Sequence, residues 1–337
     1  SDLQNNRLKI GILATYFDQH WTGGFIYLVN LINALNWLDD ADRPEIIVFY
    51  NERSAGKLGL ISYPYVHYQF LSNYHSNFTT YFHSWLQLKN QFVKDIIVQH
   101  QLDGLYPLND FPGRINNPNN HCRIVSWYPD YQQKFYPEYF SKLNLFFREL
   151  RIRNILKYST DLVQSSQNVY AHLQQFFKYN PEKIKIHLLQ FVSLIDGIPT
   201  NDIDFLRKKY GITQPYFIVS NQFYKHKNHL VVYEAIRQLR SDYEYFQVVM
   251  TGKEEDYRNP AYIQHLKKLV HDGGLEQQIK SLGVIPREHQ LGLMKHSLAV
   301  IQPSKFEGWS TVVEDAKTLQ VQLILSDISV HQEQMED

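Results

Sequence analysis

Apolar runs of five or six residues alternate with longer amphipathic stretches along this chain. Residues 9–14 (KIGILA) and 45–50 (EIIVFY) are rich in β-branched and aromatic side chains, which is typical of buried strands. Residues 24–38 between them have the apolar spacing of a helix. The alternation continues with weaker strands at 103–107 and 123–127, a helix at 138–159 and a strand at 161–165. This order predicts a doubly wound α/β layer of parallel strands joined by crossover helices.

A second set of strands begins after an interruption. Residues 192–215 contain glycine and proline but no sustained apolar period, so we interpret them as a connection between two domains. Further strands are predicted at 216–221, 246–252, 280–285, 298–304 and 322–327. We therefore expect two Rossmann-like domains, residues 1–195 and 196–337, facing each other across a cleft. Ligands of such folds bind at the carboxyl ends of the strands.

Composition narrows the class of protein. The 337 residues suffice for two cores, and 44% apolar with 20% charged residues is typical of a globular chain. Lysine and arginine balance aspartate and glutamate at 34 each, so we expect no nucleic-acid partner. The single cysteine excludes an internal disulfide and a cysteine-rich metal site. With no apolar run near the roughly 18 residues that span a bilayer, we expect a cytoplasmic protein.

One strand end leads directly into a helix with candidate chemistry, at residues 303–315 (PSKFEGWSTVVED). Gly308 and the short residues Ser310 and Thr311 form the turn and the helix start. The first N–H groups of a helix lack intrahelical partners and lie at the positive end of its dipole. The turn therefore favours an anion such as a diphosphate.

Three acids surround this turn. Glu307 precedes it, where a carboxylate can accept hydrogen bonds from sugar hydroxyls, and Glu314 and Asp315 follow one helical turn later, placed to bind a ribose. By themselves these residues equally fit a capped helix with two solvated acids. A basic loop, residues 225–228 (KHKN), follows the strand at 216–221 and is by itself typical of a solvated helix start.

Together the two motifs resemble the family-4 (group 1) retaining glycosyltransferases of the GT-B fold. The hallmark of that family is two acids separated by seven residues after a Pro-Ser strand end. The resemblance implies that Glu307 contacts the donor sugar. It assigns sugar and phosphate contacts to the turn residues Gly308, Trp309, Ser310 and Thr311. The acid in register is Asp315, where the family usually has glutamate, and Glu314 is one position early, so the ribose contact stays open between them.

The resemblance extends to two other loops of the second domain. Lys227 fits the basic residue that the family places on the donor diphosphate. Asn221 and Gln222 occupy the region where the family often has an arginine. Val284 lies in the loop where the family's backbone holds the nucleotide base.

The first domain carries weaker candidates. Gly23 and Gly24 open the first helix, where the family has a Gly-Gly facing the donor diphosphate. Asp130 follows a strand in a Pro-Asp-aromatic-Gln sequence that resembles a subgroup of the family, and we expect it to contact the acceptor or handle a proton, or else to be a turn acid. His20 and His121 are further candidates for the cleft.

Two patterns point to a metal or a membrane only weakly. Residues 40–42 spell Asp-Ala-Asp, but they follow a helix, so we interpret them as a charged turn and expect no catalytic metal. Residues 146–157 (FFRELRIRNILK) are basic and amphipathic, and fit either docking on the inner face of the membrane or a packed helix with solvated arginines.

The resemblance implies metal-independent, retaining transfer from a UDP-, GDP-, ADP- or dTDP-sugar to a hydroxyl of a glycan or lipid-linked acceptor. A non-catalytic nucleotide-sugar-binding subunit with a degenerate site stays open as the alternative. A nicotinamide dehydrogenase is disfavoured because neither domain has Gly-x-Gly-x-x-Gly after its first strand. Family members continue for several more elements that return to the first domain, so we expect that closing segment to be missing.

Overall fold

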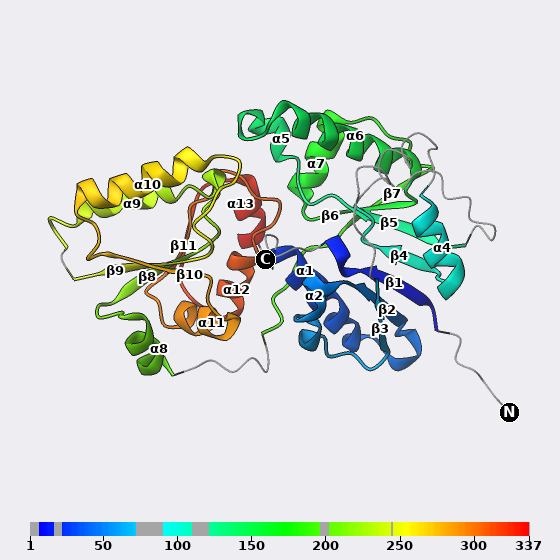
Figure 1. Ribbon diagram of the computed structural model, residues 1–337, viewed down its shortest axis with the longest axis horizontal. Coiled ribbons are helices and arrows are strands. Elements are labelled where there is room, and N and C mark those ends of the chain that lie inside the picture. Colours follow the sequence, from blue (N-terminus) through cyan, green and yellow to red (C-terminus); the bar gives the residue numbers. More distant parts are fainter. Residues whose placement is uncertain are drawn as a thin grey trace. The chain divides into compact units, whose positions relative to one another are not determined.

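The computed structural model describes residues 7–16, 22–71, 90–109, 121–195, 202–243 and 245–336. Its contacts divide the chain into two compact units (Figure 1). The first comprises Ser1–Tyr131 and Lys142–Phe191, and the second Gln132–Ser141 and Val192–Asp337. The main difference from the expected ranges 1–195 and 196–337 is Gln132–Ser141, here called the crossing segment, which packs on the second unit.

The described part of the first unit contains seven parallel strands in the order β3-β2-β1-β4-β5-β6-β7. The strands are β1 (Lys9–Leu13), β2 (Glu45–Tyr50), β3 (Val66–Phe70), β4 (Gly104–Tyr106), β5 (Arg123–Trp127), β6 (Asp161–Gln164) and β7 (Lys185–Leu188). The α-helices are α1 (Thr22–Ala34), α2 (Glu52–Ala55), α4 (Gln91–His100), α6 (Lys142–Tyr158) and α7 (Gln167–Phe176). Short 3-10 helices are η1 (Ala14–Tyr16), η2 (Leu35–Trp37), η3 (Asp40–Asp42) and η4 (Leu58–Leu60).

The core of this unit explains the apolar runs. Leu13, Phe49 and Leu105 come from three neighbouring strands and are fully buried against Val93 and Ile97 of α4. Strands of a parallel sheet are covered on both faces, so their side chains are apolar in succession and not only in alternation. The predicted strands at 9–14 and 45–50 are therefore found with nearly the expected bounds.

In the described part of the second unit, five parallel strands form a sheet in the order β10-β9-β8-β11-β12. The strands are β8 (Tyr216–Ser220), β9 (Gln247–Thr251), β10 (Ile279–Gly283), β11 (Val300–Gln302) and β12 (Leu323–Leu325). The helices are α8 (Ile203–Tyr210), α9 (His229–Leu239), α10 (Pro260–Gly273), α11 (Arg287–Lys295), α12 (Thr311–Thr318) and α13 (Ser329–Met335), with η6 at Lys225–Lys227. The crossing segment contributes α5 (Gln132–Phe135) and η5 (Pro137–Tyr139).

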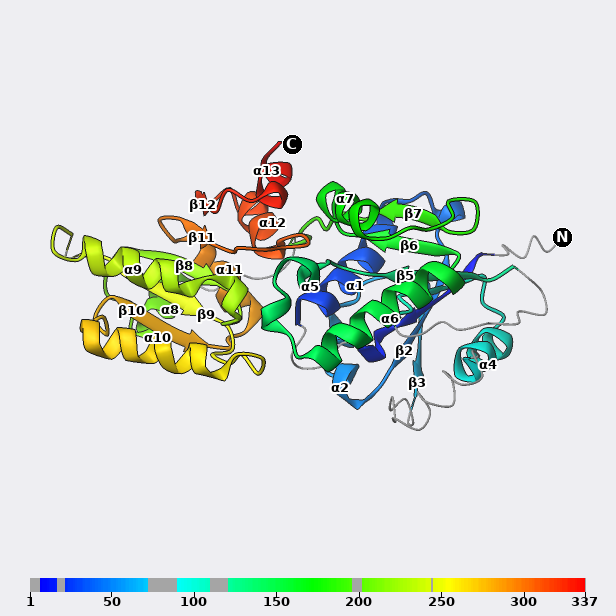
Figure 2. The ribbon, with the colours of Figure 1, turned by 90° about the horizontal axis from the view of Figure 1, so that it is seen from above.

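Helices cover both faces of this second sheet. Because side chains of a strand alternate between faces, Val248 and Met250 of β9 pack with α9 and α10, whereas Val249 packs with α8, α11 and α12. Figures 1 and 2 show α9 and α10 side by side on one face. The two parallel sheets with covering helices confirm the expected pair of Rossmann-like α/β layers.

Candidate functional site

A buried amide pair joins the strand ends of β8 and β11. Asn221 Nδ2 donates to Gln302 Oε1 over 2.8 Å, and Gln302 Nε2 donates back to Asn221 Oδ1 over 3.2 Å. Gly252, after β9, has a φ of 118°, and a Cβ there would lie 2.2 Å from the carbonyl oxygen of Asn221. Only glycine therefore allows the loops after β8 and β9 to approach this closely.

Glu307 is held at the same sheet edge through one of its two carboxylate oxygens. Its Oε1 accepts hydrogen bonds from Lys227 Nζ at 2.6 Å, Ser304 Oγ at 2.6 Å and Gln302 Nε2 at 2.9 Å. Its Oε2 accepts no hydrogen bond from the residues that the structure describes. The side chain is only 8% exposed, so three donors fix its direction and leave one oxygen available to a ligand.

The charge of Glu307 is stabilised despite burial. Burial by itself raises the pKa of this carboxyl, but the nearby Lys227 charge and the hydrogen bonds from Lys227 and Ser304 together outweigh it and lower the pKa below its ordinary value. Glu307 is therefore an acceptor at neutral pH. A carboxylate in this state can bind hydroxyls but cannot donate a proton.

The basic loop is fixed to the loop that carries Glu307. Asn228 adopts the left-handed conformation with a φ of 59°, and its Nδ2 donates to the carbonyl oxygen of Pro303 over 3.2 Å. The Lys305 N–H donates to the carbonyl oxygen of His226 over 2.8 Å. These bonds on either side of Lys227 explain why it reaches Glu307, a residue 80 positions away in the sequence.

The start of α12 differs in one respect from the prediction. The sequence predicts a free amide at Ser310, but this N–H donates to Oε1 of Gln334 over 3.3 Å. The Ser310 hydroxyl caps the helix by accepting from the N–H of Val313 at 3.3 Å. In the described part of the chain, the amides of Thr311 and Val312 have no hydrogen-bond partner. An anion at this helix start would therefore meet these two amides.

The two neighbouring acids of α12 have different environments. Asp315 is 1% exposed, and both its oxygens accept from Arg287, each at 2.6 Å, while Oδ1 also accepts from the Ser193 hydroxyl. Glu314 is 6% exposed, and its Oε1 accepts from Gln334 Nε2 at 2.9 Å. The Asp315 carboxylate is thus used within the protein, in the bidentate geometry typical of arginine–carboxylate pairs.

The other predicted residues of the second unit lie in loops that follow its strands. Gly308 is buried and Trp309 half-buried directly after Glu307. Gln222 follows Asn221 in the loop after β8. Val284 follows β10 and is 78% exposed.

Aromatic and cationic contacts attach the crossing segment to this unit. The Phe306 ring lies 5.5 Å from that of Phe135, centroid to centroid. The Arg258 guanidinium lies 5.0 Å from the centre of the Phe140 ring and donates to Gln132 Oε1 over 3.1 Å. These contacts explain why the crossing segment belongs to the second unit, although its residues were expected in the first domain.

The predicted residues of the first unit are found in loops and at a helix start. Gly23 and Gly24 lie in the first turn of α1, and a Cβ at Gly23 would meet nothing within 4 Å. Asp130 is half-buried after β5. His121 is exposed, and His20 lies outside the described residues.

Two patterns remain, the Asp-Ala-Asp turn and the basic helix at residues 146–157. Asp40 of the Asp-Ala-Asp turn pairs with Arg7 at 2.7 Å and accepts from the Tyr65 hydroxyl at 2.6 Å. The described residues contain no group of three or more His, Cys, Asp or Glu side chains arranged to hold a metal. In α6, Ile152 and Ile155 are fully buried, as in a packed helix. None of the helices described is both long and apolar enough to cross a membrane.

Sequence reasoning did not identify Gln302, Ser304, Arg287 and Gln334 as site residues. Gln302 and Ser304 had a usable signal, since they are the polar residues of the strand end immediately before Glu307. Arg287 and Gln334 had none, because their partners lie 28 and 20 to 24 positions away.

Residues 202–337 match the family model described as Glycosyl transferases group 1. No curated protein sequence matches the chain. A sucrose-phosphate synthase from Thermosynechococcus elongatus has a similar structure, with a TM-score of 0.70 at 15% identity over 96% of this chain and 82% of that one.

Two further structures are similar over nearly the whole chain. Anabaena Alr3699/HepE, solved with UDP and glucose, has a TM-score of 0.68 at 17% identity over 98% of this chain and 83% of its own. A glycosyltransferase from Rickettsia africae has a TM-score of 0.66 at 16% identity, covering 98% and 82%. At such identities these likenesses concern the fold. Residues 202–337 thus match the group 1 glycosyl transferases, and the chain as a whole has the GT-B fold of these enzymes.

Proposed function

We propose that this protein is a retaining glycosyltransferase that moves a sugar from a nucleotide-diphosphate sugar to a hydroxyl of a glycan or lipid-linked acceptor, without a catalytic metal. The main observation that supports this proposal is the buried Glu307 carboxylate, whose Oε1 is fixed by Lys227, Ser304 and Gln302. Its second oxygen is then oriented to accept from a hydroxyl of the donor sugar. The match of residues 202–337 to group 1 glycosyl transferases supports this assignment.

The diphosphate would bind beside Glu307. An ammonium group has three N–H donors, and Lys227 uses one on Glu307, so two can reach phosphate oxygens. The amides of Thr311 and Val312 offer two more donors at the positive end of α12. Together these groups would stabilise the negative charge that grows on the leaving diphosphate, the role that a divalent cation has in metal-dependent transferases.

The chemistry follows from this charge distribution. The bond between the anomeric carbon and the diphosphate oxygen breaks, and its electron pair leaves with the diphosphate. The acceptor hydroxyl attacks the oxocarbenium-like carbon from the face that the leaving group vacates, and its proton passes to the departing phosphate oxygen. This route retains the anomeric configuration and needs no pair of catalytic carboxylates of the glycosidase kind.

Glu314 is our choice for the ribose contact. Both oxygens of Asp315 already accept from Arg287, so a ribose would have to displace a buried ion pair. Glu314 lies beside the capped helix start, where Gln334 orients one of its oxygens. We assign Val284 to the base through its backbone. Gln222, Asn221, Gly308, Trp309 and Ser310 would complete the donor site.

The first unit would supply the acceptor side. Gly23 and Gly24 would allow the donor diphosphate to approach the start of α1, and Asp130 would contact the acceptor hydroxyl. We place the enzyme in the cytoplasm, either free or at the inner face of the membrane, on the grounds of the single cysteine and the basic, amphipathic residues 146–157.

A thermal-shift panel tests the donor assignment. The Alr3699/HepE structures hold UDP or UDP-glucose, so UDP-glucose is the first member, followed by GDP-, ADP- and dTDP-sugars. We expect one nucleotide class to raise the melting temperature of the full-length protein. NMR of the transferred product should then show the anomeric configuration of the donor. An inverted product would refute the retaining route, and stabilisation without nucleoside diphosphate release would favour the non-catalytic binding subunit.

A further inference from the structure

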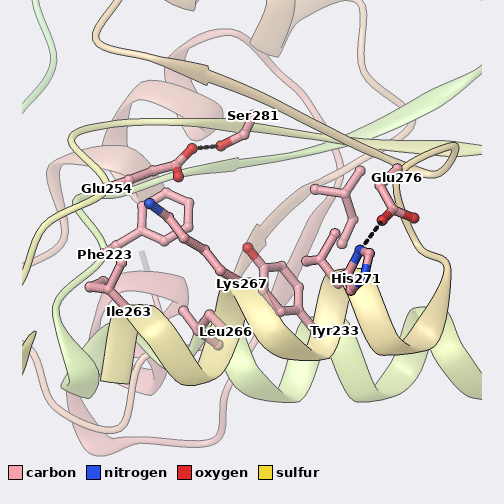
Figure 3. Close-up of a pocket in the computed structure, with 11 residues that line it drawn as sticks. Phe223, Tyr233, Glu254, Ile263, Leu266, Lys267, His271, Glu276 and Ser281 are labelled. Atoms are coloured by element: carbon pink, nitrogen blue, oxygen red, sulfur yellow. Dashed lines mark hydrogen bonds and ion pairs between the residues drawn. The ribbon is translucent and has the colours of Figure 1, made fainter. Parts of the chain in front are cut away.

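The pocket on the α9 and α10 side of the second sheet, about 270 Å³ in volume, has charges of both signs in its wall (Figure 3). Lys267 stands there with Glu254 and Glu276. This wall favours neither an anion nor a cation. The opposite edge strand of the same sheet, β12, leads to a different feature, the buried histidine His331 of α13.

His331 is 2% exposed and donates through one ring nitrogen only. Its Nδ1 lies 2.9 Å from the carbonyl oxygen of Ser326, the residue after β12. A carbonyl oxygen can only accept, so Nδ1 carries the proton. The buried Nε2 has no hydrogen-bond partner in the described part of the chain, and burial lowers the pKa of the ring. His331 is therefore neutral at physiological pH and directs its single N–H at Ser326.

A series of hydrogen bonds runs from this histidine to the candidate acid. Nδ1 of His331 also lies 3.1 Å from Ser326 Oγ, so its N–H is shared between that hydroxyl and the carbonyl. The Ser326 hydroxyl then donates its own proton to the carbonyl oxygen of Ser304 at 2.5 Å, which is much nearer than that of Gln302 at 3.5 Å. The Ser304 hydroxyl in turn donates to Glu307 Oε1 over 2.6 Å.

The direction of these bonds depends on the histidine. The Ser326 N–H donates to the carbonyl oxygen of Gln302 over 3.1 Å, so the ends of β11 and β12 stay paired without His331. The imidazole N–H occupies the Ser326 hydroxyl oxygen as an acceptor, and the hydroxyl proton is therefore directed at Ser304. Hydrogen bonds aligned in series strengthen one another, and this series ends on a buried carboxylate.

We propose that His331 is a positioning residue, which holds the Glu307 carboxylate in one orientation through Ser326 and Ser304 without touching the donor itself. This inference rests on the proposed function, in which Oε2 of Glu307 accepts from a hydroxyl of the donor sugar. It implies a selective effect. Loss of the series should weaken binding of the sugar part of the donor, while the nucleoside diphosphate, which Lys227 and the start of α12 would hold, binds as before.

Isothermal titration of the full-length protein with UDP-glucose and with UDP tests this selectivity; if the thermal-shift panel selects another nucleotide, the matching pair is used. We expect His331→Phe to weaken UDP-glucose binding by about fivefold, the effect of one lost hydrogen bond, with UDP affinity unchanged. His331→Asn keeps an N–H donor at the place of Nδ1 and should restore the wild-type affinity. The control His296→Phe, at an exposed position, should bind both ligands as wild type does.

A double-mutant cycle separates a series from independent packing effects. Ser326→Ala removes the middle hydroxyl with little change in volume, and should weaken UDP-glucose binding by a similar factor. If the two residues act in series, the double variant His331→Phe/Ser326→Ala should bind no more weakly than either single variant, whereas independent effects of fivefold each would multiply to about 25-fold. Multiplying effects, or an equal loss of UDP and UDP-glucose affinity in His331→Phe, would overturn the proposal.

A measurement without ligand distinguishes failure of this proposal from failure of the proposed function. Burial raises the pKa of Glu307, and Lys227 and the Ser304 hydroxyl outweigh it. A less firmly held Ser304 should therefore raise this pKa in His331→Phe and in Ser326→Ala, measured from the carbon-13 shift of the Glu307 carboxyl. An unchanged pKa in both variants would overturn the positioning role. Absence of nucleotide-sugar binding by the wild type would instead refute the proposed function.

Discussion

At the scale of single residues, Gln334 links α13 to the start of α12. Its carboxamide accepts from the Ser310 N–H and donates to the Ser310 carbonyl oxygen and to Glu314, and the side chain is fully buried. Gln334→Leu would leave these buried polar groups without partners, so we expect a loss of about 1–3 kcal/mol in the free energy of unfolding, measured by urea denaturation. Gln332→Leu, on the exposed face of the same helix, is the control and should change stability little.

The two acids of α12 should respond differently to neutralisation. Asp315→Asn breaks a buried pair with Arg287, so we expect a loss of about 3 kcal/mol in unfolding free energy. Glu314→Gln should raise the KM for the donor by about tenfold, the effect of losing one charge-assisted hydrogen bond, with kcat less affected. If Asp315→Asn raised the donor KM at unchanged stability while Glu314→Gln did not, the ribose assignment would have to be reversed.

His229 makes stability depend on pH. Burial, with a smaller contribution from the Lys227 charge, lowers its pKa from 6.5 to about 3, and neither ring nitrogen has a partner among the described residues. Below pH 6.5 His229 binds a proton in the unfolded chain, but it stays neutral in the folded chain until about pH 3. The free energy of unfolding should therefore fall as the pH is lowered, by up to about 1.4 kcal/mol per pH unit between pH 6 and 4.5.

Denaturation across this pH range, in wild type and His229→Phe, measures that contribution. The Phe variant can keep the stack on the Phe223 ring, whose centre lies 4.0 Å from that of His229. We expect its pH slope to be shallower by about one proton, while the exposed control His265→Phe keeps the wild-type slope. Equal slopes in wild type and His229→Phe would show that the folded protein accommodates the charge.

At the scale of elements, Arg258 makes two of the contacts that hold the crossing segment on the second unit. Arg258→Met keeps the apolar stem but removes the guanidinium above Phe140 and the hydrogen bond to Gln132. Hydrogen exchange of α5 and η5 should then become faster by about tenfold, while exchange in β8 and β9 stays unchanged. Arg237→Met on the exposed face of α9 is the control, and equal exchange in both variants would contradict an anchoring role.

Most strands could be predicted from the sequence because a buried strand of a parallel sheet has consecutive apolar residues, as in EIIVFY of β2. No strand was predicted at β3 or β7, the two edge strands of the first sheet, whose side chains are largely exposed. The sequence could not predict that α5 and η5 belong to the second unit. Their assignment to that unit depends on contacts such as that of Phe135 with Phe306, which are far apart in sequence. Local periodicity carries no information about such a partner, so 138–159 was expected as one helix although α6 begins only at Lys142.

At the scale of the whole molecule, the site could be predicted in part. Lys227 and Glu307 each follow a strand of one parallel sheet, and strand ends of such a sheet share an edge, so their proximity follows from topology. The difference between Glu314 and Asp315 could not be predicted. It is set by Arg287 and Gln334, which reach α12 from two other helices.

The central claim is that Glu307 binds the donor sugar in a working transferase. Nucleoside diphosphate release from the donor that stabilises the protein, compared between wild type and Glu307→Gln, tests it most directly. We expect release by wild type and a loss of about 100-fold or more in kcat/KM for Glu307→Gln. This variant also loses its buried pair with Lys227, so its release is measured well below its own melting temperature. Glu234→Gln, an exposed acid on α9, should behave as wild type. Unchanged release by a folded Glu307→Gln protein would contradict the account.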